Sequence, residues 1–429
     1  MKREENNLLT QVGPGTPMGR MLRQYWTPAI RSSALEPDGA PVPVRLFGQD
    51  FVAFRTTDGK AGFVDEACPH RGVSMTLARN ENNHLQCIFH GWTFDVSGKL
   101  LDAPAEPADR RAKFCSTIRV NRYCVHEAAG VVWVFVGEGE APKFPDFEFA
   151  TVPANQVHMR RGVLHYNWVQ GVEAHIDSSH VPFLHSGYLV QNKRAGFVEQ
   201  GNLEALRLML LDKSPEFEFE TTPWGLREGA LRDIGEGKAN ARIREIALPY
   251  FTFIPGPPNG QCFARMSTPI DDDTTAEWYI VYDPVRPITE EAIRGQFGYM
   301  SDDPDDFATN LGAKTNQWGQ DRQAMQEGHF SGLTKGIAFE DFAVQASMGR
   351  RVDRSLEQLG SSDTIIVKVR RMLMEALDNF LHGKPAPWRE GFDYQHIRSQ
   401  SVTYAKGEDW RRYAFTGASS SNDRIPEKV

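Results

Sequence analysis

The sequence contains few cysteines and no long apolar run, and both features narrow what the protein can be. Five cysteines among 429 residues are an odd number and do not make the disulfide framework of a small secreted domain. The longest apolar stretches, such as residues 130–137 (GVVWVFVG), are far shorter than the roughly 18 residues that a membrane span needs. Residues 1–11 are charged and polar and lack the apolar core of a signal peptide. We therefore expect a soluble, cytoplasmic protein.

The sequence also lacks runs of positive charge, internal repeats and low-complexity segments. Lys and Arg total 48 and Asp and Glu total 56, which gives a net charge of −8. This balance argues against nucleic acid or an anionic membrane as the main partner. Hydrophobic residues make up 40% and charged residues 24% of the chain, which is ordinary globular usage and excludes a disordered or fibrous protein.

Changes of pattern along the chain predict two domains after a short N-terminal arm, and the length suits two domains of roughly 100–200 residues each. Short β-branched and aromatic segments between residues 41 and 137 predict a compact all-β domain. Longer, mixed helical and strand-like segments from residue 158 onward predict an α+β domain. The predicted divisions are a helical arm (1–30), an all-β domain (31–155) and an α+β domain (156–429). In the last domain we expect helices at residues 167–185, 288–301, 315–327 and 362–380 and strands at residues 205–211, 243–254 and 277–285.

Two predicted loops of the all-β domain carry one cysteine and one histidine each. Cys68-Pro-His70 is followed, after sixteen intervening residues, by Cys87-Ile-Phe-His90. Zinc sites usually pair Cys with Cys and His with His, whereas this mixed pairing suits a two-iron cluster with the cysteines on one iron and the histidines on the other. Zinc shares these ligand types and is one alternative; four buried residues without a metal are the other. The pattern resembles the Rieske [2Fe–2S] domain, which accepts electrons easily, so a second redox centre is expected.

A second group of metal-binding side chains lies in the predicted helix 167–185. Asp177 and His180 are three residues apart and would share one helix face, whereas His185 would lie roughly 140° around the axis from His180. Pro182 stands between the histidines, and a proline bends or breaks a helix, which would bring both imidazoles to one metal. Two histidines and a carboxylate form the facial triad of non-haem Fe(II) oxygenases. The alternative is a set of polar helix residues without a metal.

With both groups present, the chain resembles the oxygenase component of Rieske non-haem iron ring-hydroxylating enzymes. More closely, it resembles the phthalate dioxygenase branch, whose catalytic chain has no small β partner. The motif D-x-x-H-x-x-x-x-H is present as Asp177, His180 and His185, and the segments PMGRMLRQYWTPA, CPHRG, CIFHGW and AFEDFAVQASMGRRVDRSLEQLGSSD also match. The resemblance implies a Rieske domain followed by a helix-grip-like α+β catalytic domain that holds mononuclear Fe(II).

The resemblance also implies a role for each acidic residue. The third iron ligand comes from a Glu-Asp pair on a later helix, which matches Asp341, with Glu340 as the alternative. Asp177 would not bind iron but would contact His180 and, in a head-to-tail ring of subunits, His90 of the partner subunit. A carboxylate between two metal-bound imidazoles fixes their tautomers and provides a short electron path. The implied assembly is a homotrimer or two stacked trimers.

The functional prediction is an oxygenase that uses O₂ and electrons to hydroxylate an aromatic carboxylate such as phthalate, isophthalate or a substituted benzoate. We expect cis-dihydroxylation, although the iron ligands leave monooxygenation, such as O-demethylation, open. No GxGxxG fingerprint follows a strand, so NADH would be oxidised by a separate flavin and iron–sulfur reductase. A Rieske electron carrier and a zinc-binding interaction protein are alternatives from other classes, and a carrier needs no open iron at His180 and His185.

An aryl carboxylate in an apolar pocket requires a fixed cation, and arginine has the matching planar fork. Arg207 lies inside the apolar run LEALRLMLL, and Arg242 and Arg244 are two residues apart, so on a strand both face the same side. An unpaired buried charge is costly, and the alternative to a bound substrate is an internal salt bridge to Glu204 or Glu245. The resemblance favours a bound substrate carboxylate, since the phthalate dioxygenase branch holds dicarboxylates with basic residues in this region. The predicted substrate-binding residues are Arg207, Arg244 and Ser179.

Overall fold

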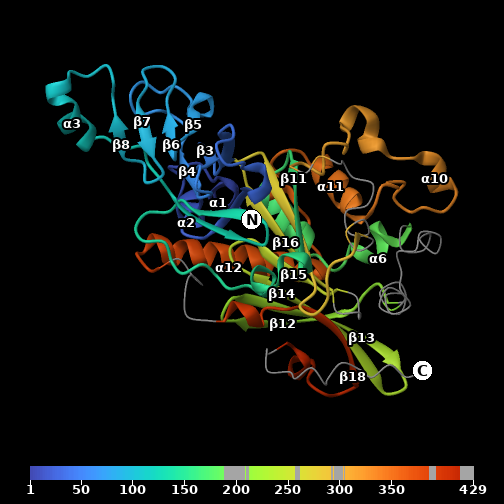
Figure 1. Ribbon diagram of the computed structural model, residues 1–429. Coiled ribbons are helices and arrows are strands. Elements are labelled where there is room, and N and C mark those ends of the chain that lie inside the picture. Colours follow the sequence, from blue (N-terminus) through green and yellow to red (C-terminus); the bar gives the residue numbers. More distant parts are fainter. Residues whose placement is uncertain are drawn as a thin grey trace. The chain divides into compact units, whose positions relative to one another are not determined.

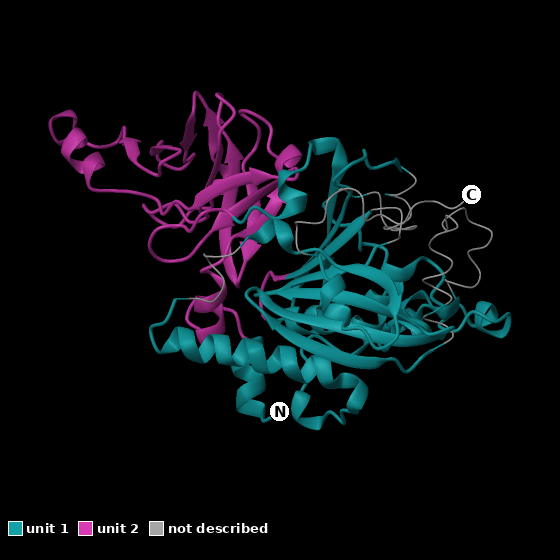
Figure 2. Ribbon diagram, turned by 90° about the horizontal axis from the view of Figure 1, so that it is seen from below, with its two compact units in different colours: residues 1–10, 145–267, 273–429 teal, residues 11–144, 268–272 magenta. Residues whose placement is uncertain are grey.

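The computed structural model describes residues 1–187, 208, 212–256, 261–290, 293, 303, 305–385 and 393–415. The chain divides into two compact units, shown in different colours in Figure 2. The first, which we call the β unit, comprises residues 11–144 and 268–272. The second, the α+β unit, comprises residues 1–10, 145–267 and 273–429. The predicted order of an all-β part followed by an α+β part is confirmed.

The β unit contains three small antiparallel sheets, built from the short β-branched and aromatic segments that predicted strands. Its elements are α2 (Pro17–Leu22), β1 (Thr27–Arg31), β2 (Val42–Leu46), β3 (Gln49–Arg55), β4 (Ala61–Asp65), β5 (Arg79–Glu81), β6 (His84–Gln86), β7 (Thr93–Asp95), β8 (Leu100–Asp102), α3 (Ala108–Ser116), β9 (Cys124–Ala128) and β10 (Val131–Phe135). The sheets have the orders β1-β10-β9, β2-β3-β4 and β5-β6-β7-β8. The second and third sheets lie on either side of the loop of Cys68 in the sequence, and the loop of Cys87 joins β6 to β7.

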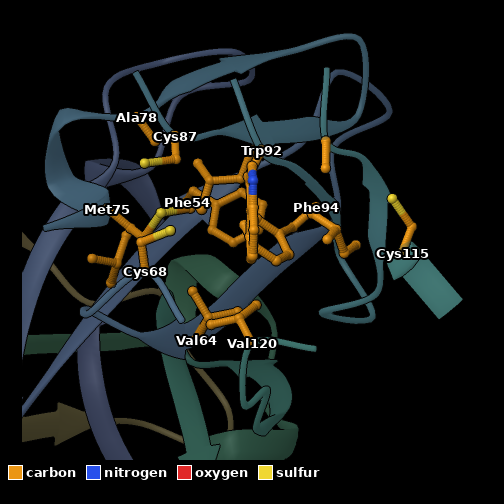
Figure 3. Packing of buried hydrophobic residues seen from close by; sticks show 14 residues of the cluster. Phe54, Val64, Cys68, Met75, Ala78, Cys87, Trp92, Phe94, Cys115 and Val120 are labelled. Atoms are coloured by element: carbon orange, nitrogen blue, oxygen red, sulfur yellow. The ribbon is translucent and has the colours of Figure 1, made fainter. Parts of the chain in front are cut away.

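A buried hydrophobic cluster supports both of these loops. Phe54, Trp92 and Phe94 pack in it together with Cys68 and Cys87, and Figure 3 shows the two cysteines close to each other at one end of the cluster. Packed protein interiors tolerate little displacement. The hydrophobic cluster therefore holds the backbone of both loops in place, whereas His70 is exposed and His90 is partly exposed.

The α+β unit is built around one large sheet. Its elements are α1 (Arg3–Thr10), α4 (Glu148–Thr151), β11 (Val157–Leu164), α5 (Trp168–Ile176), α6 (Val181–Leu184), β12 (Glu216–Thr222), β13 (Gly225–Gly235), β14 (Lys238–Ala247), β15 (Phe251–Ile254), β16 (Cys262–Pro269), β17 (Thr275–Tyr282), α10 (Arg322–Gln326), α11 (Ile337–Ser347), α12 (Thr364–Leu381) and β18 (Gln400–Ala405). Among the described residues the strand order is β11-β17-β16-β15-β14-β13-β12, with β18 beside β14. Helices α5 and α12 lie against this sheet (Figure 1).

Helix α12 illustrates why the predicted helical pattern produced a helix on the sheet. Ile366, Val369, Leu373 and Leu377 are buried and recur at three- or four-residue spacing, which forms one apolar stripe. The predicted helix 362–380 is therefore confirmed within two residues at each end.

Other predicted elements differ in detail. The predicted strand 243–254 is two strands, β14 and β15, joined by a turn at residues 248–250. The predicted helix 315–327 is a 3₁₀ segment, Lys314–Gly319, followed by α10. The predicted helix 288–301 and strand 205–211 lie largely outside the described residues. None of the helices in the described part of the chain has the length and apolar composition that crossing a membrane requires.

Candidate functional site

The two cysteine–histidine loops of the β unit have the same backbone hydrogen bonds. In each, the cysteine N–H donates to the carbonyl five residues later and the cysteine carbonyl accepts from a glycine N–H four residues later. The distances are 2.9 and 2.9 Å at Cys68 and 2.9 and 3.0 Å at Cys87. Gly72 and Gly91 close the loops with φ angles of 76° and 72°, a region that favours glycine. The loops therefore present their side chains in matching ways.

These side chains converge in a manner that fits a metal cluster. The imidazole centroids of His70 and His90 are 4.5 Å apart, and both thiols are buried. The Nδ1 atom of His90 is buried and has no hydrogen-bond partner among the described residues, so it is available to a metal. Burial raises the pKa of the Cys68 thiol to about 11, and two adjacent thiolates therefore require a cation. The four residues could hold a [2Fe–2S] cluster.

In the α+β unit the segment with Asp177 and the two histidines is not one helix. Helix α5 ends at Ile176, and Asp177 follows it with extended backbone (φ −72°, ψ 117°). Its Oδ1 atom accepts the N–H of Ser179 at 2.6 Å, which competes with further helix formation. Pro182 lies at the start of α6, where its missing N–H costs nothing. The predicted shared helix face of Asp177 and His180, and the predicted break at Pro182, are therefore wrong.

The break between α5 and α6, together with α11, brings three predicted ligands close to one another. His180, His185 and Asp341 each offer one ligand atom within 4.8 Å of the others. The Nε2 atoms of the two histidines are 3.2 Å apart, and Asp341 Oδ1 lies 3.4 Å from the first and 3.1 Å from the second. Atoms bound at about 2.1 Å to one ion lie about 3.0 Å apart at right angles and about 3.4 Å apart in a tetrahedron. The observed separations fit a single metal ion.

Each imidazole has its other nitrogen beside a second carboxylate. His180 Nδ1 is 3.3 Å from Asp177 Oδ2, and His185 Nδ1 is 2.7 Å from Glu340 Oε2. Metal-binding histidines usually donate their second N–H to such a group, which fixes the tautomer. Asp341 therefore lies beside the Nε2 atoms of His180 and His185, whereas Glu340 lies beside Nδ1 of His185.

The pKa values in this group reflect strong attraction between the two imidazoles and the carboxylates around them. Burial alone would lower the pKa of His185, but the Asp341 and Glu340 carboxylates raise it to about 10. The pKa of His180 is also raised despite its burial, through Asp177 and Asp341. Burial opposes ionisation of Asp341, yet the two imidazoles hold its pKa far below the usual range. A divalent cation would experience the same attraction as the imidazole protons do.

Three arginines and one glutamate, which we call the arginine group, lie on neighbouring strands β13 and β14: Arg232, Arg242, Arg244 and Glu228. Arg244 pairs directly opposite Glu228, so both side chains are on the same sheet face. Arg244 Nη1 donates to the carbonyl of Ile176 at 2.7 Å and lies 3.9 Å from Glu228 Oε2. This hydrogen bond connects the group to the end of α5, next to Asp177.

The charge of the arginine group is not balanced within the group. Burial, and then repulsion from Arg244 and Arg232, lower the pKa of Arg242 to about 9. Arg244 Nε and Glu228 Oε1 are buried without a hydrogen-bond partner among the described residues. A bound anion would relieve the repulsion between the arginines and accept the N–H of Arg244 Nε.

Some sequence predictions about binding residues need correction. The alternative internal salt bridge of Arg244 is present, but it is made to Glu228 at 3.9 Å and not to Glu245, which points to the other sheet face and pairs with Arg227 at 2.5 Å. Ser179 is not on a helix beside His180 but in the interrupted segment, where its hydroxyl lies 3.5 Å from the carbonyl of Ser362. The predicted residues Arg207 and Glu204 lie outside the described residues.

Sequence reasoning missed several buried polar residues around the site. Ser178 donates to Glu228 at 3.0 Å, and Ser331 donates to Glu340 at 2.5 Å. Glu277, another buried acid that the sequence did not single out, lies 3.5 Å from His175, which is not among the candidate metal ligands. No helical or strand spacing connects these pairs, since Ser178 and Glu228 are 50 positions apart and Ser331 and Glu340 are 9 positions apart.

Comparison with known families finds two matches that together span most of the chain. The Rieske [2Fe-2S] domain family matches residues 25–124. The family described as LigXa C-terminal domain like matches residues 134–427.

Curated relatives similar to this chain are oxygenase subunits. The phthalate 4,5-dioxygenase oxygenase subunit of Pseudomonas putida is 37% identical over 96% of this chain and 94% of its own length. The 3-chlorobenzoate-3,4-dioxygenase oxygenase subunit of Comamonas testosteroni is 34% identical over 87% of this chain and 88% of its own. The 5,5'-dehydrodivanillate O-demethylase oxygenase subunit of a Sphingobium species is 28% identical over 89% and 81%.

A solved structure shares the fold at lower identity. The terminal oxygenase of carbazole 1,9a-dioxygenase from Novosphingobium sp. KA1 has a TM-score of 0.56 and 21% identity, over 86% of this chain and 94% of that one. This similarity shows the fold, and the relatives above show the family.

Proposed function

The chain belongs to the Rieske oxygenases, in the branch of the phthalate dioxygenase oxygenase subunits, and from this premise we propose that it hydroxylates an aromatic carboxylate. The reaction would use O₂ and electrons that a separate flavin and iron–sulfur reductase takes from NADH. The observation that carries the proposal is the convergence of His180, His185 and Asp341 on one point. An electron carrier would need no such group.

The Rieske cluster and the mononuclear iron would have different tasks, electron transfer and O₂ activation. Cys68 and Cys87 would hold one iron of the Rieske cluster and His70 and His90 the other. His180, His185 and Asp341 would hold Fe(II) with free positions, which supplies O₂ activation when bound. Asp177, whose carboxylate faces His180 Nδ1 at 3.3 Å, would keep that imidazole in the tautomer that directs Nε2 to the metal.

Electron transfer is proposed to cross a subunit boundary. The buried Nδ1 of His90 would face the cluster, which leaves Nε2 for an outside partner. Asp177 is partly exposed and could accept a hydrogen bond from the partner subunit's His90. A head-to-tail contact of this kind closes into a ring, and we propose a homotrimer or two stacked trimers, working in the cytoplasm where an NADH-dependent reductase would supply electrons.

The arginine group supports the choice of an anionic substrate. Arg244 is buried, adjoins the end of α5 through Ile176, and belongs to a group with excess positive charge. An aryl carboxylate bound there would satisfy the Nε atom that has no partner among the described residues. Arg207 and Ser179 remain proposed contributors. Relatives that act on phthalate and 3-chlorobenzoate, both aromatic acids, agree with this class of substrate.

The experiment is a single turnover with chemically reduced protein, ¹⁸O₂ and a panel of phthalate, isophthalate, 3-chlorobenzoate and phenoxybenzoate. Incorporation of both oxygen atoms into one product would identify dioxygenation. Incorporation of one atom, or loss of a methyl group from an added methoxybenzoate, would favour the monooxygenase alternative suggested by the O-demethylase relative.

Two variants control this experiment. His180→Ala should keep the visible spectrum of the cluster and lose all product, whereas Cys87→Ser should lose the cluster spectrum itself, since each removes one ligand. Product formation by His180→Ala would refute the proposed metal site. The absence of product from every aromatic acid, with both metals present, would refute the proposed substrate class.

A further inference from the structure

We infer that Glu340 is a positioning residue that holds His185 in the orientation needed for metal binding, and that Ser331 holds Glu340 in turn. The inference rests on the proposed metal site at His180, His185 and Asp341. It assigns the first acid of the Glu-Asp pair a role that differs from that of its neighbour.

The contacts of Glu340 account for both of its carboxylate oxygens. Oε2 lies 2.7 Å from His185 Nδ1, and Oε1 accepts the hydroxyl of Ser331 at 2.5 Å. The Glu340 side chain is fully buried, with 0% exposed. The Ser331 oxygen accepts the N–H of Leu333 at 3.1 Å, and Nδ1 of the buried His329 lies 3.4 Å from it. The carboxylate is therefore held from two sides and cannot rotate away freely.

These contacts determine which nitrogen of His185 is available to a metal. An ionised carboxylate can only accept hydrogen bonds, so Nδ1 of His185 carries the proton. Nε2 then has its lone pair directed to the point where Asp341 Oδ1 lies, 3.1 Å away. The negative charge of Glu340 also makes the imidazole a better donor to a cation.

Glu340 is placed to orient His185 and not to bind the ion itself. Successive residues of an α-helix point about 100° apart, so Glu340 and Asp341 on α11 face different sides of the imidazole. Asp341 is on the Nε2 side and Glu340 is on the Nδ1 side. The comparable carboxylate beside His180 is Asp177, which is 25% exposed in its side chain. One imidazole is thus oriented by a carboxylate that a partner can reach, and the other by a carboxylate inside the chain.

The experiment measures metal affinity directly. The mononuclear metal is removed from the holoprotein with a chelator under anaerobic conditions, the cluster is verified by its visible spectrum, and Co(II) is titrated back. Glu340→Gln keeps the shape and removes the charge, and Ser331→Ala removes only the supporting hydroxyl. Glu277→Gln is the matched control, since Glu277 is equally buried and lies outside the proposed metal site.

We expect Glu340→Gln to weaken Co(II) binding by about 10- to 100-fold, as is usual when the carboxylate partner of a metal-bound histidine is lost. Ser331→Ala should weaken it less, and Glu277→Gln should leave it unchanged. The Co(II) absorption bands should keep their positions in Glu340→Gln and change in Asp341→Asn, because only Asp341 is a ligand.

Wild-type Co(II) affinity in folded Glu340→Gln would overturn the inference, even if its thermal midpoint fell, because a purely structural residue affects stability and not affinity. Absorption bands altered as in Asp341→Asn would also overturn it, since they would identify Glu340 as a ligand. If Glu340→Gln does not fold, Ser331→Ala decides, and unchanged affinity there refutes the inference. Wild-type Co(II) affinity in the His180→Ala variant would instead refute the proposed metal site.

Discussion

Replacement of Arg244 by methionine tests how the proposed substrate is bound. Arg244→Met keeps a long, unbranched side chain at a buried position, 3% exposed, and removes the charge. A hydrogen bond between charged groups contributes about 1.5–3 kcal/mol. Because about 1.4 kcal/mol corresponds to a factor of ten in affinity, the Kd for an aromatic acid should rise by about 10- to 150-fold.

The assay must separate this loss from an indirect effect on the metal site. Arg244 also donates to the carbonyl of Ile176 at 2.7 Å, and the loss of that hydrogen bond could disturb Asp177 whatever the substrate. Equilibrium binding is therefore measured without O₂ for two ligands, an aromatic acid and its uncharged amide. An effect on carboxylate recognition weakens only the acid, whereas a disturbance of the site weakens both.

A matched control lies on the neighbouring strand. Arg227 pairs with Glu245 on the opposite face of the sheet, and the double variant Arg227→Met and Glu245→Gln removes both charges together, so that no buried charge remains unpaired. It should bind the acid with wild-type affinity. Equal affinity of Arg244→Met and the wild-type protein for the acid would refute the proposed role of Arg244.

Two other predictions concern the electron path and Glu277, the buried acid that lies against α5 at Gly171. Asp177→Asn should retain both metals but slow the single-turnover oxidation of the reduced cluster by about 10- to 100-fold, and an unchanged rate, measured by stopped-flow absorption, would exclude the bridging role. Burial raises the pKa of Glu277 from its ordinary value of 4.5 to about 8, so the folded protein holds a proton that the unfolded chain releases and stability falls as pH rises between these values. Glu277→Gln should flatten this decline in denaturant titrations from pH 5 to 8, and an unchanged slope would contradict the assignment.

Candidate metal ligands could be proposed from the sequence because metal binding restricts both residue type and local spacing. Cys68 and His70 lie within one tight loop, as do Cys87 and His90, and few arrangements other than a metal site require such pairs. The family resemblance supplied Asp341, which no local pattern connects with His180. A continuous run of β-branched and aromatic residues likewise predicted β10, which is buried along its whole length, and helical apolar spacing predicted α12, since both signals lie within a single element.

Local backbone geometry was harder to predict where side chains compete with the helix. The sequence 167–185 has helical apolar spacing, yet the Asp177 carboxylate accepts the Ser179 N–H and the chain leaves the helix before Pro182. The packing of α5 was equally hard to predict, since Gly171 permits a close approach of Glu277: a Cβ atom there would lie 1.9 Å from Glu277 Oε1. Such a contact is not encoded in neighbouring residues.

The sequence by itself determined the order of the two units and the family, and it supplied the types of the candidate metal ligands, because these depend on short-range spacing and on patterns within single elements. Only the tertiary structure decided what supports the ligands. His185 and Glu340 are 155 positions apart, and Arg244 is 68 positions from Ile176. A carboxylate or a guanidinium has its function set by the partner that the fold brings within hydrogen-bond distance, and no local periodicity specifies that partner.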